Sequence, residues 1–382
     1  MEVYTMTFMK NIKRNGNKYV LLVIDGTALV VTNFYGGVPI YIQNEKDLDK
    51  LNALCRKELR QTKNGIYTHA VIATILNILS LMRFYGATHV AVCFDKNSKT
   101  TFRKKLYPAY KETRHPKPDA LKESVETTRT ILKNIGIPSF WADQFEADDL
   151  AGSLINQFKY DCDKVFFVTK DHDWLQLIDG NVKGLLMQSS EERAAKMREL
   201  YKALPENNDM ADPFNLKTYR KCVTFDENVT YANDGVYPKQ IVDLKALAGD
   251  TSDNIPGVKG IGDKTAAGIL NCFQTIESLY AAIDACKDKN DTFDNAFDEN
   301  ALAELAKKLK QFGVTRNPLP KLIAGRNDAF LSKKLATINC NIPIDFDLSR
   351  LEPHINPDMV KRTIEYYEMD ELQYLIDNDN TR

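Results

Sequence analysis

Continuous runs of mostly apolar residues, each followed within two positions by an acidic residue, recur through the first half of this chain. The runs and their acids are Tyr19–Ile24 with Asp25, Thr88–Phe94 with Asp95, and Lys164–Thr169 with Asp171 and Asp173. Short apolar runs without polar alternation are typical of parallel strands that are buried on both faces of a sheet. The pattern therefore predicts three buried parallel strands.

Helical patterns separate these runs. Ile66–Tyr85 contains no Gly or Pro and repeats apolar residues at helical spacing. Glu45–Arg60 is also helix-like, and Glu123–Ile135 ends at Gly136, a common residue just beyond a helix C-terminus. Strands that alternate with helices in this way predict an α/β fold, with a mostly parallel central sheet flanked by helices.

The strand-end acids are expected to share one site, because ligands of open α/β sheets bind beyond the carboxyl ends of the strands. A further cluster, Glu146, Asp148 and Asp149, begins a helical run that continues to Ile155. Acids suit the first turn of a helix, and a single strand-end Asp is more often a turn or cap than a ligand. Several acids in one crevice repel one another unless a cation binds, and all-oxygen ligands favour Mg²⁺ or Mn²⁺.

A glycine-rich stretch, Gly249–Gly268, follows a helical pattern at 236–248. Its glycines permit a tight turn between two helices and let backbone N–H groups approach a phosphate oxygen. With its lysines, the stretch predicts a helix-hairpin-helix type element that holds a nucleic-acid backbone without reading bases. The residues assigned to this contact are Gly257, Val258, Lys259, Gly260, Ile261, Gly262 and Lys264.

A basic segment follows the second predicted strand. Between residues 96 and 117 a single acid, Glu112, stands among the lysines and arginines, and aromatic residues are interleaved. The cations are Lys96, Lys99, Arg103, Lys104, Lys105, Lys111, Arg114 and Lys117. A charge run is usually a solvated face, but this one directly follows Asp95 and should overhang the metal crevice. There, cations would bind phosphates and aromatic faces would stack on unpaired bases.

Overall composition narrows the cellular context. The net charge is −1, and the seven cysteines are scattered without a CxxC pair. These features argue against a zinc site, a disulfide framework and a uniformly basic nucleic-acid surface. The chain shows no signal peptide and no apolar run long enough to span a membrane. We therefore expect a cytoplasmic protein with no membrane partner.

Six separate motifs, in order along the chain, resemble the 5′→3′ exonucleases and flap endonucleases of bacteria and phages, including the 5′ nuclease domain of DNA polymerase I. They are Ile24–Gly26, Val92–Asp95, Phe102–Arg103 with Tyr110–Arg114, Phe145–Asp149, Thr169–Asp173 and Gly249–Gly262. Leu335–Ile338 also resembles a stretch near the C-terminal end of the family. The resemblance covers about Tyr19 to Leu348.

The resemblance implies a stand-alone nuclease, because no polymerase sequence follows before Arg382. Such enzymes hydrolyse DNA at 5′ ends, 5′ flaps and single-strand/duplex junctions, leaving a 5′-phosphate and a 3′-hydroxyl, in replication and repair. The implied fold is a PIN-like or resolvase-like core followed by a helical helix–three-turn–helix region. Two-metal hydrolysis without a protein nucleophile is the implied mechanism. A K⁺ ion at the helix–three-turn–helix, an RNA primer as substrate and a monomeric state are further expectations.

The resemblance also assigns roles to individual residues. The first metal set would be Asp25, Asp95, Glu146, Asp148 and Asp149. The second metal set would be Asp171, Asp173, Asp250 and Asp253. Lys111 and Arg114 would steady the scissile phosphate, and Tyr110 would stack near it. Arg103 is also expected to be a catalytic residue, and Lys104 and Lys105 are expected to bind DNA.

Three regions are expected. Residues 1–235 would form the catalytic domain, with the basic arch at about 96–122 and an insertion at about 181–235. Residues 236–348 would form the helical DNA-binding domain, and residues 349–382 a helical tail. Two alternatives stay open: a structure-specific DNA-binding protein without activity, and a PIN-like ribonuclease, which would share the acid-ended strands but lack the Gly249–Gly262 element.

Overall fold

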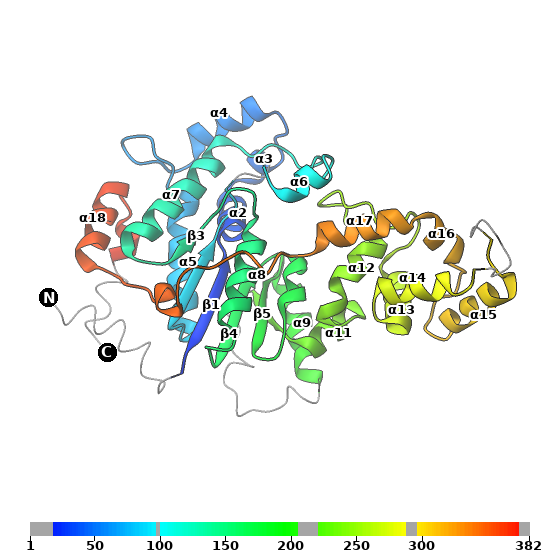
Figure 1. Ribbon diagram of the computed structural model, residues 1–382. Coiled ribbons are helices and arrows are strands. Elements are labelled where there is room, and N and C mark those ends of the chain that lie inside the picture. The colour runs from blue at the N-terminus through cyan, green and yellow to red at the C-terminus, as the bar shows by residue number, and fades with distance from the viewer. Residues whose placement is uncertain (1–17, 97–99, 205–220, 288–295, 374–382) are drawn as a thin grey trace.

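The computed structural model describes residues 18–96, 100–204, 221–287 and 296–373. Lys99 of the basic segment lies outside the described residues. Within them, six strands form one sheet in the order β3-β2-β1-β4-β5-β6. The sheet forms the centre of one half of the molecule, and a set of helices extends from its side (Figure 1).

Five neighbouring strands are parallel, and only the edge strand β6 runs antiparallel to its neighbour β5. The strands are β1 (Val20–Asp25), β2 (His89–Cys93), β3 (Ser139–Phe140), β4 (Lys164–Thr169), β5 (Val182–Met187) and β6 (Cys222–Phe225). The three predicted strands are β1, β2 and β4, and they lie side by side with β1 in the centre. Neither β3 nor the two strands contributed by residues 181–235 were predicted from the sequence.

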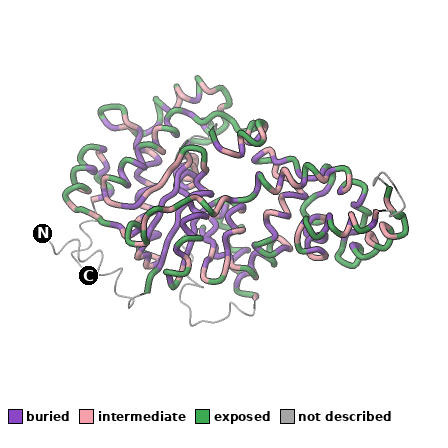
Figure 2. The backbone as a smooth tube through the Cα atoms, viewed as in Figure 1, coloured by how far each residue is buried: buried purple, intermediate pink, exposed green. Residues whose placement is uncertain are grey.

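Both faces of the sheet are buried, as the continuous apolar runs predict. Leu21 and Val23 of β1 join a core cluster with α8 (Ala147–Phe158). Leu22 and Ile24, which point to the opposite face, pack with α2 (Gly26–Gly37) and α5 (His69–Tyr85). The strands accordingly run through the most buried part of the chain (Figure 2). A strand buried on both sides has no polar alternation, which is why its sequence reads as an uninterrupted apolar run.

Further α-helices complete this half of the molecule. They are α3 (Ile40–Gln43), α4 (Leu48–Glu58), α6 (Phe102–Leu106), α7 (Asp119–Ile135), α9 (Glu191–Ala203) and α11 (Glu227–Asp234). The helix predicted from Ile66 begins at His69, and the helix predicted from Glu123 begins four residues earlier, at Asp119. Pro118 supplies its N-cap, where the missing N–H of proline costs no helical hydrogen bond.

The remaining helices form the extension seen beside the sheet in Figure 1. They are α12 (Ile241–Ala248), α13 (Asp263–Phe273), α14 (Ile276–Asp284), α15 (Glu299–Lys310), α16 (Leu319–Ala324) and α17 (Arg326–Ala336). From the last two residues of α17 the chain returns across α8, and we call residues 335–342 the return segment. It is followed by α18 (Pro357–Tyr367), which packs against α7. The extension shares one apolar core with the α8 face of the sheet.

A bilayer-crossing helix would need a long apolar stretch. Among the helices of the described residues, none combines the length and the hydropathy that this requires.

Gly136, which ends α7, should be a site of large stability loss on substitution. Its φ is +82°, and a Cβ there would lie 1.8 Å from the carbonyl oxygen of His354. Gly180 has a similar φ of +55°, but a Cβ there would meet no atom of the described residues within 4 Å. We expect Gly180→Ala to cost about 1 kcal/mol for the left-handed backbone and Gly136→Ala about 2 kcal/mol more, for overpacking. Urea denaturation measures both; equal losses would contradict the close approach of His354.

Candidate metal centre and nucleic-acid interface

The carboxyl ends of β1, β2 and β4 bring three predicted acids together: Asp25, Asp95 and Asp171. Asp25 caps α2 by accepting a hydrogen bond from the Ala28 amide at 2.9 Å, and its second oxygen accepts one from the Thr169 hydroxyl at 2.8 Å. These contacts hold the carboxylate at the carboxyl ends of the strands. β2 and β3 lie on one side of β1 and β4 to β6 on the other, so the strand order reverses beside β1, where open α/β sheets bind ligands. The structure therefore places these three acids in one neighbourhood.

Asp25 is buried beside other carboxylates, and its pKa is strongly raised. Burial, followed by repulsion from Asp95 and then Asp171, raises its pKa to about 7, although hydrogen bonds from Ala28 and Thr169 oppose the rise. Among the ion pairs of the described residues, none involves Asp25. A buried carboxylate with carboxylate neighbours and no cationic partner is stabilised by an added cation.

The α8 cluster divides into a buried and a more open part. Glu146 is the N-cap of α8 and Asp149 is its third residue, and the two form a capping box, with the Glu146 amide donating to Asp149 at 3.1 Å. Glu146 and Asp149 are buried, whereas the side chain of Asp148 keeps 18% of its exposure. Asp95 accepts a hydrogen bond from the Ala147 amide at 2.9 Å. This bond joins the end of β2 to the start of α8.

Arg103 lies beneath this cluster and is only 1% exposed. Its guanidinium donates two hydrogen bonds to Asp149, both at 2.8 Å, and one to Glu146 at 3.0 Å. It also donates to the carbonyl oxygens of Leu335 at 2.8 Å and Thr337 at 2.9 Å. The basic segment thus sends one of its cations into the interior, where it ties α8 to the return segment.

Several protein groups donate hydrogen bonds to the Asp149 carboxylate. Besides Arg103 and the Glu146 amide, it accepts a hydrogen bond from the Asn339 amide at 2.8 Å. Its side chain is fully buried. These contacts favour a supporting role for Asp149, which holds the helix start in place, and leave Asp148 as the more accessible acid of the pair.

Three further residues of the basic segment reach the acids. The Tyr110 hydroxyl lies 3.0 Å from both Glu146 and Asp253, and Tyr110 is buried. The Lys111 ammonium lies 2.6 Å from Glu146 and 3.5 Å from Asp253. Arg114, whose side chain is half exposed, pairs with Asp253. Lys104 donates to the Tyr110 carbonyl at 2.9 Å, and Lys105 is exposed on the outer side of α6.

These ion pairs are reflected in the pKa values. Burial raises the pKa of the Asp253 carboxyl, but Lys111 and Arg114 more than offset it, and the net pKa is lowered. Burial likewise lowers the pKa of Lys111, but Glu146 and Asp253 outweigh it and leave the pKa raised. The acid and the base therefore both stay charged at neutral pH.

The second predicted acid set is joined by a cation that the sequence patterns did not single out. Lys245 on α12 pairs with both Asp173 and Asp250. It lies five residues before Asp250, on the helix that leads into the glycine-rich turn, and its position relative to Asp173 depends on tertiary packing. A single lysine within an amphipathic helix pattern carries no signal that could have identified it.

The chemistry of the donors fits hard divalent cations, because the predicted set consists of carboxylates alone. The raised pKa of Asp25 points the same way. Among the residues that the structure describes, no three His, Cys, Asp or Glu side chains are grouped in an arrangement that could hold a metal ion. Instead, Arg103, Lys111, Arg114 and Lys245 pair with acids of the predicted sets.

The glycine-rich turn between α12 and α13 divides into buried and exposed residues. The buried ones use their amides internally: Gly257 donates to the Ser332 hydroxyl at 2.9 Å, Val258 to Leu247 at 2.8 Å and Ile261 to Val258 at 3.0 Å. The exposed ones are Lys259, Gly260, Gly262 and Lys264. The turn can therefore present only its exposed backbone and lysines to a ligand, and its apolar residues anchor it.

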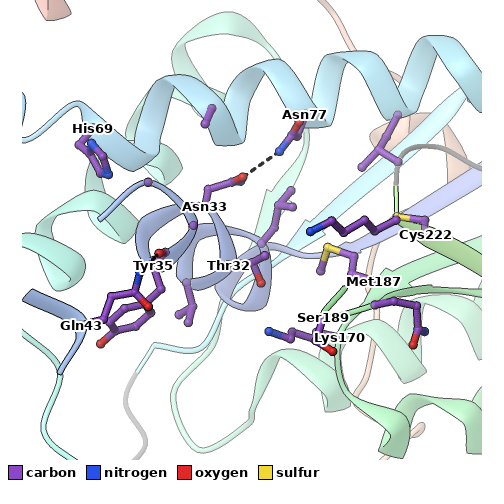
Figure 3. A pocket seen from close by; sticks show the side chains of 18 residues that line it. Thr32, Asn33, Tyr35, Gln43, His69, Asn77, Lys170, Met187, Ser189 and Cys222 are labelled. Atoms are coloured by element: carbon purple, nitrogen blue, oxygen red, sulfur yellow. Dashed lines mark hydrogen bonds between the residues drawn. The ribbon is translucent and has the colours of Figure 1, made fainter. Parts of the chain in front are cut away.

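A separate pocket of about 730 Å³ lies between α2, α5 and the ends of β5 and β6 (Figure 3). Asn33 and Asn77 hydrogen-bond to each other across α2 and α5 at 2.9 Å, and Lys170, which precedes Asp171, lies on the opposite side. None of the predicted site residues lines this pocket. The acids occupy the region around the strand ends, beside the start of α2.

Two family models match this chain. Residues 20–203 match the 5′–3′ exonuclease N-terminal resolvase-like domain. Residues 236–358 match the 5′–3′ exonuclease C-terminal SAM fold. The chain belongs to the 5′–3′ exonuclease family. The predicted family, a family of nucleases, and the predicted fold class are thereby confirmed.

Curated relatives of the chain include both long and short proteins. DNA polymerase I of Caldicellulosiruptor bescii is 34% identical over 290 residues, which are 76% of this chain and 28% of that protein. The chain likewise spans 30% of the length of DNA polymerase I of Lactococcus lactis. The 5′–3′ exonuclease of Bacillus subtilis is 27% identical over 330 residues, which are 86% of this chain and 86% of that protein.

Among solved structures, the chain is similar to a flap endonuclease of bacteriophage T5 in a complex with DNA and metal ions. The similarity covers 94% of this chain and 97% of that chain, with 18% sequence identity and a TM-score of 0.51. At this identity the likeness shows a shared fold, an α/β core followed by a helical region.

Replacement of Arg103 should be severely destabilising. Arg103→Met removes the cation but leaves Asp149 and Glu146 buried, and an uncompensated buried charge costs about 3–5 kcal/mol. Lys105→Met, two residues away on the exposed side of α6, should cost less than about 0.5 kcal/mol. Chemical denaturation measures both free energies of unfolding. A similar, small loss in both variants would contradict the central position of Arg103.

The contribution of Asp25 to the stability of the metal-free protein should fall as pH rises. Because the folded pKa of Asp25 is about 7 and its ordinary value is 3.8, the folded state prefers the protonated form. The stability that this preference contributes is present below the ordinary value and is lost as pH rises through the folded pKa. We expect this contribution to fall by about 2.5 kcal/mol between about pH 5 and about pH 7.5 in EDTA.

Asp25→Asn, which cannot ionise, should lack this part of the pH dependence, and Mg²⁺ should reduce the loss in the parent protein alone. Urea denaturation at the two pH values checks the expectation. Identical pH profiles for parent and variant would show that Asp25 is not the group responsible.

Proposed function

We propose that this chain is a metal-dependent, structure-specific 5′ nuclease that hydrolyses DNA at 5′ ends and 5′ flaps. One observation carries the proposal: Glu146 of the α8 start and Asp253 of the glycine-rich turn are joined by Tyr110 and Lys111 of the basic segment. The acids proposed as metal ligands are thus in contact with the residues proposed to bind phosphate. One of these acids, Asp253, belongs to the turn proposed to bind the DNA backbone.

The proposed metal ligands form two sets. Asp25, Asp95, Glu146 and Asp148 would hold one ion, and Asp171, Asp173, Asp250 and Asp253 would hold the other, with Asp149 retaining its contacts to Arg103. Bound Mg²⁺ or Mn²⁺ supplies an activated water and stabilises charge on the attacking and leaving oxygens of the phosphodiester. The products would be a 5′-phosphate and a 3′-hydroxyl. The Lys245 ammonium, now paired with Asp173 and Asp250, would give up these partners to the second ion.

The basic residues would exchange their carboxylate partners for phosphate groups of the substrate. Lys111 and Arg114 balance Glu146 and Asp253 in the absence of metal, and once ions neutralise those acids the two cations are available for the scissile phosphate. Tyr110 would close this edge of the site. Lys104 and Lys105 would line the path of the 5′ strand, and Arg103 would act from beneath the acids.

Duplex DNA would lie along the exposed part of the glycine-rich turn. Lys259 and Lys264 would contact phosphates, with the Gly260 and Gly262 backbone between them. The bacteriophage T5 relative, solved with DNA and metal ions, has the same fold and supports this arrangement. A K⁺ ion at the turn, an RNA primer as substrate, a monomeric state and the three domain boundaries remain predictions.

The test is cleavage of a 5′-labelled flap DNA with Mg²⁺, alongside an RNA of the same sequence. The parent protein should cut the DNA near the junction. Asp148→Asn should lower the rate by at least about 100-fold while preserving DNA affinity, because Asp148 is the most accessible acid at the start of α8 and its loss removes a proposed ligand. Asp161→Asn, an exposed acid beyond the end of α8, is the matched control and should retain full activity.

Each alternative has its own outcome. Binding of the flap without cleavage would support a DNA-binding protein without activity. Cleavage of RNA alone would support a ribonuclease. Full activity in Asp148→Asn would overturn the ligand assignment while leaving the nuclease function standing.

A further inference from the structure

The side chain of Gln176 hydrogen-bonds to two segments that are far apart in sequence. It lies in the 3-10 helix η1 (His172–Leu177), one turn after Asp173. Its side-chain nitrogen donates to the carbonyl oxygen of Asp173 at 2.8 Å and to that of Ala336 at 3.1 Å. Its side-chain oxygen accepts a hydrogen bond from the Ile338 amide at 3.0 Å. Both donor hydrogens of the amide group and one of its acceptor sites are therefore engaged.

The return segment is held from two sides in an alternating pattern. Arg103 binds the carbonyl oxygens of Leu335 and Thr337, whereas Gln176 binds the carbonyl of Ala336 and the amide of Ile338. Leu335 and Ala336 are the last two residues of α17, so their carbonyl oxygens lack helical partners and need other donors. The backbone becomes extended at Thr337. This short stretch of backbone therefore contacts the residue that holds Glu146 and Asp149 and also the residue that holds Asp173.

We infer that Gln176 is a positioning residue for the second metal set, and that the return segment fixes the separation of the two sets. The side chain of Gln176 does not reach the acids themselves, since its contacts are with backbone. Its effect passes through the carbonyl of Asp173, whose carboxylate shares the Lys245 ammonium with Asp250. The inference rests on the proposed metal-dependent function.

Ser153 provides a matched control, because it hydrogen-bonds to the return segment and to no acidic residue of the two metal sets. Its hydroxyl, on α8, donates to the Asn339 carbonyl and accepts from the Ile342 amide, both at 3.0 Å. Ser153 is buried, and its loss leaves two backbone groups of the return segment without their partner, as the loss of Gln176 does. A purely structural role of the segment would make Gln176 and Ser153 equivalent.

The experiment compares parent, Gln176→Met and Ser153→Ala by calorimetric titration with Mg²⁺ and by the Mg²⁺ dependence of flap cleavage. Gln176→Met should weaken the binding of one ion by about 10- to 100-fold, as loss of a residue that orients a ligand does. Raising the Mg²⁺ concentration should restore most of its rate. Ser153→Ala should bind Mg²⁺ as the parent does, although denaturation should show a similar loss of stability in both variants.

Two outcomes would overturn the inference: unchanged Mg²⁺ binding in Gln176→Met, or equal weakening in both variants. A parent protein that binds no Mg²⁺ would overturn the proposed function instead. A crystal structure of metal-free Gln176→Met then decides the inference by itself. It should show the Asp173 carboxylate displaced from Lys245, and an unmoved carboxylate would refute the role of Gln176.

Discussion

The site depends on one buried cation. A guanidinium with almost no exposure is costly to remove from water, and it is tolerated only where its hydrogen bonds and charge are matched. Arg103 meets both conditions with five hydrogen bonds, to Glu146, to Asp149 and to two backbone carbonyls. Without it, the start of α8 could not carry acids into the interior, and the segment that returns from the helical extension would lose its attachment to the core.

The other acids follow two different electrostatic arrangements. Asp173, Asp250 and Asp253 pair with lysine and arginine side chains, and these cations lower the pKa of Asp250 and of Asp253 despite their burial. Asp25 has no cationic partner among the described residues, and burial, followed by repulsion from Asp95 and Asp171, raises its pKa. A divalent ion would relieve the repulsion at Asp25 and at the same time release cations from the neighbouring acids. The cations of the chain and those of the solution therefore compete for one set of carboxylates, and a DNA phosphate offers the released cations a new partner.

Much of this arrangement could be predicted from sequence, and the reasons for the failures are physical. β1, β2 and β4 are buried on both faces, so their apolar runs are unmistakable, and the topology then gathers their acids at one edge. β5 was missed because Lys183 and Gly184 interrupt its apolar run, and β6 because four residues give too little pattern. Periodicity could show that α8 starts among acids, but not which acid is buried.

The roles of individual cations were harder to predict. A basic run looks like a solvated face, and nothing in residues 96–117 distinguishes the buried Arg103 from the exposed Lys105. Lys245 and Gln176 act across sequence separations that only the folded chain brings together. Such contacts depend on the packing of α12 and of the return segment against the sheet, and single-sequence patterns do not record that packing.

The most direct test of the account is an anomalous difference map from crystals soaked in Mn²⁺. The central claim is that the acids at the strand ends, at the start of α8 and in the glycine-rich turn together bind divalent ions. The account predicts about two peaks among these acids, with Lys111 and Lys245 moved away from Glu146 and Asp173. Crystals that show no Mn²⁺ among the acids and retain both lysine pairs would contradict it.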